Sequence, residues 1–480
     1  MPRMSFDTIT FWTFFAVAWA LWRWLPFGLA KTSALILSLV FYGWWDPRYI
    51  VLIIGSSLVD YHAGHRIHES TSDSIRRGWL ALSITCNLGL LAIFKYAPFA
   101  NENVARLAEL LGLDGPEPLT DWVIPVGISF YTFQTLSYSI DIYRRNLKPT
   151  ESLRDFLLFV SFYPQLVAGP IVRAKDLLPQ LEHRRRLLPA AVQMGLYYVI
   201  VGLFLKIVVA DNLALPINAA FRPDRLPNLS PCIAWLAMVY FAFQILADFA
   251  GYSGIAIGLA YLLGLRFPRN FNYPYIAGGL SEFWTRWHIS LSQWLRDYLY
   301  ISLGGNRKGL PRMMLALMLT MVIGGLWHGP SWNFVAWGTL HGIGLCVERA
   351  LRGNRRKAPT GAPKNFIDFA LRLVRIAVVF VFILVTWVFF RASDFEAAMI
   401  MLERMWIAPF TEDFGLERLA NARHLLLILP IVLLHIGQLS HEWYGVRKTA
   451  WRRAFVAAAC LAALIIVRRG APQEFIYFQF

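Results

Sequence analysis

Residues 313–346 read MMLALMLTMVIGGLWHGPSWNFVAWGTLHGIGLC, a stretch without any Asp, Glu, Lys or Arg. A helix that crosses the hydrocarbon core of a bilayer needs about 20 such residues. Further apolar stretches lie near residues 8–28, 32–58, 78–99, 122–140, 155–172, 188–210, 231–264, 372–391, 424–440 and 454–467. Together they predict an all-α polytopic membrane protein with roughly ten or eleven crossings.

The composition supports the same class of protein. Of the 480 residues, 57% are hydrophobic and only 16% are charged, whereas soluble domains average about 25% charged residues. The mean hydropathy is +0.47. So few charges exclude several soluble domains, and the composition also excludes disordered and collagen-like chains. Four scattered cysteines without a CxxC pair exclude a disulfide scaffold. We expect one membrane domain over residues 1–480, with its core motifs in 124–346.

The net charge of +16 is unevenly distributed. Residues 348–375 hold eight basic and two acidic side chains. In the connections 100–121 and 392–420, by contrast, most of the charged side chains are acidic. By the positive-inside rule, 348–370 is expected on the cytoplasmic side and the two acidic connections on the periplasmic side. Because the basic residues are scattered between apolar stretches, no nucleic-acid partner is expected.

Two apolar stretches contain helix-breaking residues. Asp46-Pro47-Arg48 interrupts the second stretch, and Pro164 with Gly169-Pro170 interrupts the fifth. Irregular backbone at membrane depth occurs where it is buried in protein or lines a cavity. Re-entrant segments and ordinary helix ends both fit these breaks.

Residues 281–299 lie between two apolar blocks and predict one continuous amphipathic helix. Ser281 is a suitable N-cap, and Glu282 follows in the first turn. Apolar residues recur every three or four positions, at Phe283, Trp287, Leu291, Trp294, Leu295 and Tyr298. Such a helix either lies in the membrane interface or packs beneath the bundle and carries polar groups into a cavity.

Titratable side chains inside apolar segments are costly and commonly functional. His328 lies within 313–346 between Gly325 and Gly329, whose small size lets backbone or substrate approach closely, and His288 lies on the amphipathic segment. A neutral imidazole can accept the proton of a hydroxyl that attacks an acyl carbon. For each of these histidines, and for His341, a hydrogen-bonded structural role is the alternative.

Other chemistry finds little support in the sequence. There is no GxSxG, P-loop or HExxH motif. His62, His65 and His68 are regularly spaced but have no carboxylate or thiolate companion, so a polar helix end is expected there and no metal site. Asp60 and Asp248 lie near the ends of apolar stretches and are expected to pair with arginines.

Several stretches resemble the membrane-bound O-acyltransferase family, in particular its bacterial branch of alginate O-acetylases and D-alanyl-exporting proteins. They include IPVGISFYTFQTLSYSIDIYRR at 124–145, FVSFYPQLVAGPIVR at 159–173, DFAGYSGIAIGLAYLLG at 248–264 and FPRNFNYPY at 267–275. The series continues with FWTRWHISLSQWLRDYLYISLGGN at 283–306, GLWHGPSWNFVAWGTLHG at 325–342 and FIYFQF at the C-terminus. Thr285 and Ser302 depart from the usual pattern of the family, and neither replaces a histidine.

The resemblance implies a ring of tilted transmembrane helices around a thin centre, with re-entrant or amphipathic helices. It also implies that His328 is catalytic, with His288 as the second site histidine. The implied enzyme is a multi-pass protein of the bacterial inner membrane that O-acetylates an exported polysaccharide such as alginate. It would bind no permanent cofactor, would take the acetyl group from acetyl-CoA, and would act with an extracytoplasmic SGNH or esterase-like acetyltransferase, the polysaccharide export machinery and membrane lipid.

Three other functions remain open from the sequence. Acetylated cellulose or another surface polymer would change only the acceptor. D-alanyl, lipid or peptidoglycan acylation would change the donor or the acceptor. A transporter without chemistry of its own would use the histidines to line a proton or substrate path.

Overall fold

The computed structural model describes residues 4–119, 124–166, 169–307, 309–352, 362–407, 422–444, 450–467, 473 and 475–476. Every regular element among these residues is a helix, which confirms the predicted all-α class. The chain forms two compact units, one of residues 1–199 and 255–268, the other of residues 200–254 and 269–480. The expectation of a single membrane domain stays a prediction.

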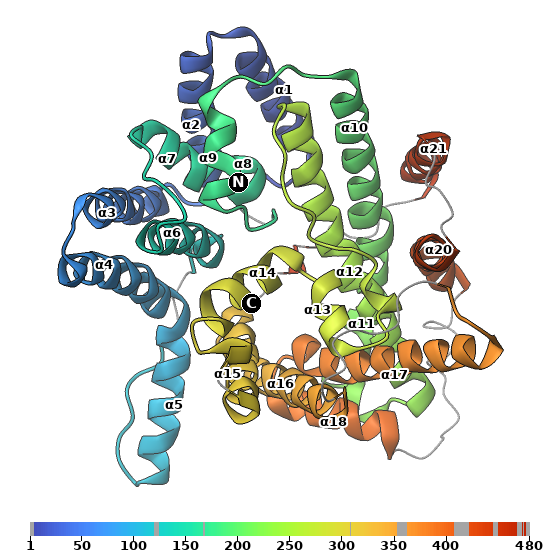
Figure 1. The fold of residues 1–480 in the computed structure, drawn as a ribbon. Helices are drawn as coiled ribbons and strands as arrows, with labels where there is room; N and C mark the ends of the chain where they lie inside the picture. The colour runs from blue at the N-terminus through green and yellow to red at the C-terminus, as the bar shows by residue number, and fades with distance from the viewer. Residues whose placement is uncertain are drawn as a thin grey trace. The chain divides into compact units, whose positions relative to one another are not determined.

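The first unit contains the N-terminal helices. They are α1 (Ile9–Trp24), α2 (Phe27–Gly43), α3 (Ile50–Glu69), α4 (Asp73–Leu91), α5 (Ala97–Leu110), α6 (Ile128–Tyr143), α7 (Leu153–Ser161), α8 (Tyr163–Leu166) and α9 (Ala174–Glu182). Helices α3, α4 and α6 pack against one another (Figure 1). The boundary between the units falls inside α10 (Pro189–Leu203) and α12 (Pro231–Leu262), so each of these helices contributes to both.

The second unit contains the elements that carry the candidate histidines. Its remaining helices are α11 (Asp211–Ala220), α13 (Leu280–Arg286), α14 (Ile289–Trp294), α15 (Gly309–His328), α16 (Trp332–Arg352), α17 (Phe366–Arg391), α18 (Phe395–Trp406), α20 (Ala422–Tyr444) and α21 (Ala450–Ile466). In this unit α15 packs along α16, and α16 packs against α17 (Figure 1).

Six helices in the described part of the chain are long and apolar enough to cross a membrane. They span Asp73–Leu110, Pro189–Ala220, Pro231–Leu262, Gly309–His328, Phe366–Arg391 and His424–Glu442. The expectation of ten or eleven crossings is therefore too high by this measure. The expected stretch 155–172 shows one reason, because its helices are α7, with nine residues, and α8, with four. The chain is a multi-pass membrane protein.

The two predicted breaks in the apolar stretches are confirmed. A 3₁₀ turn at Pro47–Tyr49 separates α2 from α3, and the Asp46 side chain accepts a hydrogen bond from the Arg48 N–H at its start. In the fifth stretch, helix α7 ends at Ser161, and the four-residue helix α8 follows at Tyr163. Proline explains both interruptions, because it lacks an N–H and its ring disfavours helix in the residue before it.

The prediction of one continuous helix over 281–299 is wrong. Helix α13 ends at Arg286, and α14 starts at Ile289, after which Leu295–Tyr300 adopts π-helical geometry. The break falls at His288, whose φ of 41° and ψ of 55° lie in the left-handed region. Gly279, rather than Ser281, occupies the N-cap position of α13. Apolar spacing alone does not reveal a single left-handed residue inside an otherwise helical pattern.

The described residues cover the predicted loops only in part. The undescribed residues include 120–121 and 408–420 of the two acidic connections, 353–361 of the basic connection and 477–480 of the C-terminal FIYFQF stretch. Within the acidic connection 392–420, residues Phe395–Trp406 form helix α18. The orientation of these connections across the membrane stays a prediction.

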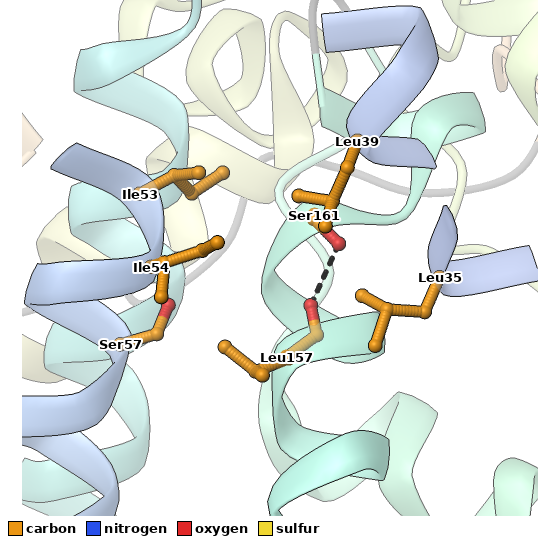
Figure 2. Close-up of a pocket in the computed structure, with 7 residues that line it drawn as sticks. All are labelled: Leu35, Leu39, Ile53, Ile54, Ser57, Leu157 and Ser161. Carbon is orange, nitrogen blue, oxygen red and sulfur yellow. Dashed lines mark hydrogen bonds between the residues drawn. The ribbon is translucent and has the colours of Figure 1, made fainter. Parts of the chain in front are cut away.

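The first unit holds a small apolar cavity between α2, α3 and α7 (Figure 2). It is lined by Leu35, Leu39, Ile53, Ile54, Ser57, Leu157 and Ser161. The Ser161 hydroxyl donates to the Leu157 carbonyl at 2.7 Å, within the helix that carries both. The lining has no acid, base or thiol, so acid–base chemistry requires another part of the protein.

Asp60 forms a buried polar contact in the first unit that the sequence did not predict. Its carboxylate accepts hydrogen bonds from Ser83 Oγ at 2.5 Å, Asn87 Nδ2 at 2.7 Å and Ser139 Oγ at 3.2 Å. These donors come from α4 and α6, so the network ties three helices together. The expected pairing of Asp60 with an arginine is wrong, because its donors are hydroxyl and amide groups.

Candidate functional site

His288 lies at the junction of α13 and α14 and is fully buried. A left-handed conformation is uncommon for a residue with a side chain, and it costs on the order of 1–3 kcal/mol. Backbone strain of this kind persists where surrounding contacts fix it, and it is frequent at functional sites. At His288 the neighbouring backbone supplies such a contact, since the Ile289 N–H donates to the Asn270 carbonyl at 2.9 Å.

The side chain of Asn270 orients the His288 ring. The Asn270 Nδ2 group donates to Ser253 Oγ at 3.1 Å, so its Oδ1 atom faces His288 as an acceptor. His288 Nδ1 lies 3.1 Å from this Oδ1 and therefore donates to it. Ser290 also donates to the same oxygen, from its N–H at 3.2 Å and from its hydroxyl at 2.9 Å. In the neutral ring, Nε2 is then the nitrogen that can accept a hydrogen bond.

Burial keeps His288 neutral. Loss of solvent lowers the pKa of its imidazole to about 3, from an ordinary value of about 6.5. The ring of Phe249 stands edge-on to it at a centroid distance of 4.6 Å. At neutral pH this histidine is therefore an uncharged hydrogen-bonding group.

His328 is the last residue of α15 and is 3% exposed. Aromatic rings surround it, with centroid distances of 5.0 Å to Trp327, 5.1 Å to Trp337 and 5.2 Å to Phe390. The C-terminal end of a helix carries partial negative charge and stabilises a cation there, by up to about 2 kcal/mol in partly buried sites. This position favours a histidine that must carry a positive charge for part of a reaction.

The structure brings the two predicted site histidines together. Their ring centroids are 6.5 Å apart and their planes are inclined by 63°. One ring is held as a neutral group, and the other lies at a helix end that stabilises a cation. Two imidazoles in this arrangement can act on one substrate, one by accepting the proton of the reacting hydroxyl and the other by accepting a hydrogen bond from a neighbouring donor group.

The glycines beside His328 take one of the two roles expected for them. A Cβ atom on Gly325 would lie 2.2 Å from the Phe334 carbonyl oxygen, and one on Gly329 would lie 2.1 Å from the Phe334 ring. The expected close approach of backbone is therefore confirmed at Gly325, whereas atoms of Phe334 and not a substrate fill the space beside both glycines. They allow α15 and α16 to approach closely, and this contact places Phe334 and Trp337 near His328.

We expect Gly325→Ala to destabilise the protein strongly. The added methyl group meets backbone of α16, which has no flexible end to move aside. Gly55→Ala is the matched control, because a Cβ on this exposed helical residue meets nothing within 4 Å. Thermal unfolding in detergent should show a clear loss for Gly325→Ala and no loss for Gly55→Ala. Equal melting temperatures for the two variants would contradict the packing argument.

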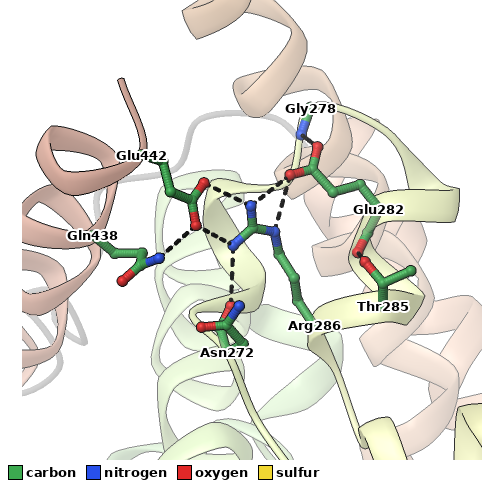
Figure 3. Close-up of polar contacts among 7 residues, drawn as sticks. All are labelled: Asn272, Gly278, Glu282, Thr285, Arg286, Gln438 and Glu442. Atoms are coloured by element: carbon green, nitrogen blue, oxygen red, sulfur yellow. Dashed lines mark hydrogen bonds and ion pairs between the residues drawn. The ribbon is translucent and has the colours of Figure 1, made fainter. Parts of the chain in front are cut away.

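Arg286, two residues before His288, fixes the end of α13 (Figure 3). Its guanidinium donates to Glu282 at 2.7 Å and to Glu442 of α20 at 2.8 Å, and also to the Asn272 carbonyl at 3.3 Å. Gln438 donates to Glu442 at 2.5 Å. Burial lowers the pKa of Arg286, but the two carboxylates outweigh it and raise the pKa overall. This network anchors the segment that carries His288.

Lys206 is a buried charge within an apolar helix that the sequence analysis did not single out. Its ammonium group lies 2.9 Å from Asp211 and 2.8 Å from Asp248, and it donates to the Gln473 carbonyl at 3.0 Å. Asp248 in turn accepts from the Ile476 N–H at 2.7 Å. The expected arginine partner of Asp248 is therefore a lysine. A lysine inside the apolar stretch 188–210 was the available signal.

No cluster of three or more His, Cys, Asp or Glu in the described residues has metal-binding geometry. His62 Nδ1 lies 2.8 Å from the Leu58 carbonyl, and His65 Nε2 lies 3.1 Å from the Thr150 carbonyl. These contacts give both histidines backbone partners.

Comparison with known proteins gives one family. The model of the MBOAT, membrane-bound O-acyltransferase family matches residues 143–393. A Pseudomonas aeruginosa protein named "Probable alginate O-acetylase AlgI" is 38% identical over 86% of this chain and 76% of its own length. A Helicobacter pylori peptidoglycan O-acetyltransferase is 37% identical over 78% of this chain and 73% of its own. A teichoic acid D-alanyltransferase of Streptococcus thermophilus is 32% identical over 50% of this chain and 59% of its own.

Proposed function

Since the chain belongs to the membrane-bound O-acyltransferase family, we propose that it O-acetylates a polysaccharide, with alginate as the first candidate. Alginate and peptidoglycan are the polymers named for relatives that are 38% and 37% identical. The D-alanyltransferase aligns with a smaller share of the chain. An acetyl group therefore has more support than a D-alanyl group. The two O-acetyltransferases are nearly equally similar, so peptidoglycan is the second candidate acceptor.

The observation that carries the proposal is the buried pair of histidines, with ring centroids 6.5 Å apart. His328 accepts the proton of the acceptor hydroxyl while the hydroxyl oxygen attacks the carbonyl carbon of an acetyl thioester. The tetrahedral intermediate then collapses, the carbon–sulfur bond breaks, and the imidazolium returns the proton to the leaving thiolate. A thioester is already activated, so a base and correct positioning are the main requirements.

His288 contributes a neutral, oriented hydrogen-bonding atom. Asn270 holds its Nδ1–H, so Nε2 is the nitrogen that can accept a hydrogen bond from a second donor group of the substrate. Its pKa of about 3 makes it a weak base, which favours His328 as the proton acceptor. The aromatic rings around both histidines limit water access, and this protects the thioester from hydrolysis.

The donor, the membrane and the partners belong to the same proposal. Acetyl-CoA from the cytosol is the donor, and no permanent cofactor takes part. The protein lies in the bacterial inner membrane and passes the acetyl group to the exported side. There it acts with an SGNH or esterase-like acetyltransferase and with the polysaccharide export machinery. The connection 348–370 is expected to face the cytoplasm because residues 348–375 hold eight basic and two acidic side chains, and this supports the orientation.

The test compares a strain lacking the gene with the same strain carrying it again. The proposal predicts that O-acetyl groups disappear from the exported polymer and return on complementation. In membranes of the complemented strain, label from acetyl-CoA should enter the polymer, and label from a D-alanyl carrier-protein thioester should not. Unchanged acetylation in the deletion strain, as a transporter with another cargo would give, would contradict the proposal.

A further inference from the structure

Three aromatic residues of the second unit form a cluster beside His328. Trp284 of α13 packs on Trp337 and His341 of α16, with ring centroid distances of 5.7 Å and 5.2 Å. The Trp337 and His341 rings are 4.8 Å apart. Trp337 in turn stands edge-on to His328 at 5.1 Å. The Trp284–Trp337–His341 cluster therefore adjoins the ring that we assign as the catalytic base.

The ring nitrogens of this cluster are buried without hydrogen-bond partners among the described residues. They are Trp284 Nε1, Trp337 Nε1 and both His341 nitrogens. His341 is completely buried, and Trp337 is 1% exposed. Apolar rings flank His341 on further sides, with Phe283 at 6.3 Å and Phe382 at 5.5 Å.

Such an arrangement is expensive in a folded protein. Buried polar atoms are nearly always hydrogen-bonded, and each exception calls for an explanation. Phenylalanine would fill the position of His341 with a ring and without the penalty of two unpaired nitrogens. Four such atoms in one cluster next to the candidate base indicate that their partners arrive with a ligand.

We propose that the Trp284–Trp337–His341 cluster is a hydrogen-bonding site for a polar group of the substrates. The proposal deepens the proposed acyl transfer and rests on it. Each indole N–H only donates, whereas a neutral imidazole donates from one nitrogen and accepts at the other. The matching ligand group carries acceptor oxygen together with an N–H or O–H donor. An amide in the arm of the thioester donor and a hydroxyl of the sugar acceptor both have this chemistry.

The first variant to test is His341→Phe, with the full protein in membranes that contain its partner proteins. Acetyl-CoA and polymer are titrated separately, and the transferred acetyl label is measured. We expect KM to rise about tenfold for the substrate whose polar group binds here, since one hydrogen bond is worth on the order of tenfold in affinity. A rise for acetyl-CoA assigns the site to the donor, and a rise for the polymer assigns it to the acceptor.

Trp284→Phe removes a single donor and should give a smaller rise for the same substrate. Phe382→Leu is the matched control, because it alters packing on His341 without changing a hydrogen-bonding atom. Its KM values should stay within about twofold of the parent, well below the effect of a lost hydrogen bond. Melting temperature in detergent separates binding from folding. His341→Phe should melt at or above the parent temperature, because it removes unpaired buried nitrogens.

Two results would contradict the proposal that this cluster binds a polar group of the substrates. One is a His341→Phe protein whose KM values for both substrates equal those of the parent. The other is a melting temperature that falls together with the transfer rate, which would make the nitrogens part of the folded framework. Failure of the proposed function is distinct, because the parent protein itself would then transfer no acetyl group.

Discussion

Cells that carry His328→Gln are expected to lose acetylation of the polymer almost completely while the protein still accumulates in the membrane. Glutamine keeps much of the volume and hydrogen bonding of histidine, but it cannot accept the proton of an attacking hydroxyl. A general base contributes typically 10²–10⁴-fold to the rate. His328 ends α15 inside an aromatic cluster, where a neighbouring side chain has little room to replace it. The measurement is the acetyl content of the polymer together with the abundance of the variant protein in the membranes of the same cells.

His62→Gln is the matched control for this experiment. It is the same substitution at an exposed histidine whose Nδ1 contacts a carbonyl of its own helix. Acetylation should remain normal in this control. Normal acetylation in His328→Gln at equal abundance would instead make His328 a structural residue.

Loss of His288 is the second large effect we expect. Both His288→Ala and His288→Asn should lower the transfer rate by about 100-fold or more, because the oriented Nε2 atom is lost. The Asn variant distinguishes loss of the imidazole from a change in backbone conformation, because asparagine tolerates the left-handed conformation seen at this position. Transfer measured in membranes at matched protein levels decides the outcome. Activity within twofold of the parent in His288→Asn would mean that this position serves only the break between α13 and α14.

His288 should also leave a signature in the pH dependence of stability. Its folded pKa of about 3 lies below the unfolded value of about 6.5, so the unfolded chain binds the proton more readily. The contribution of His288 to the free energy of unfolding is therefore complete above pH 6.5. It is lost as the pH falls towards 3, by about 1.4 kcal/mol per pH unit. Melting curves at pH 7 and pH 5 should show a smaller acid effect in His288→Asn than in the parent.

The sequence predicted the helical class, and it singled out His328 as a histidine inside an apolar stretch; the site roles of His328 and His288 stay predictions. Long apolar runs identify membrane helices, and a titratable residue within one is conspicuous. The interruption at Pro47 was also predictable, because proline has a fixed local effect.

Long-range partners could not be predicted in the same way. Asn270 orients His288 from 18 residues away, and Glu442 reaches Arg286 from 156 residues away. The pattern of apolar residues indicates which face of a helix is buried, but it does not indicate which polar groups from distant parts of the chain contact that helix. The left-handed backbone at His288 was missed for a related reason, since tertiary contacts and not local propensity hold it.

The double variant His288→Gln, His328→Gln tests most directly the claim that the two histidines act on one reaction. Label from acetyl-CoA is followed into polymer with membranes of the parent, each single variant and the double variant, at equal protein abundance. Residues that act as a unit have strongly non-additive effects on rate. We expect the double variant to retain about the same residual rate as the slower single variant. Losses that multiply, so that the double variant falls by the product of the two single effects, would show that the histidines act independently.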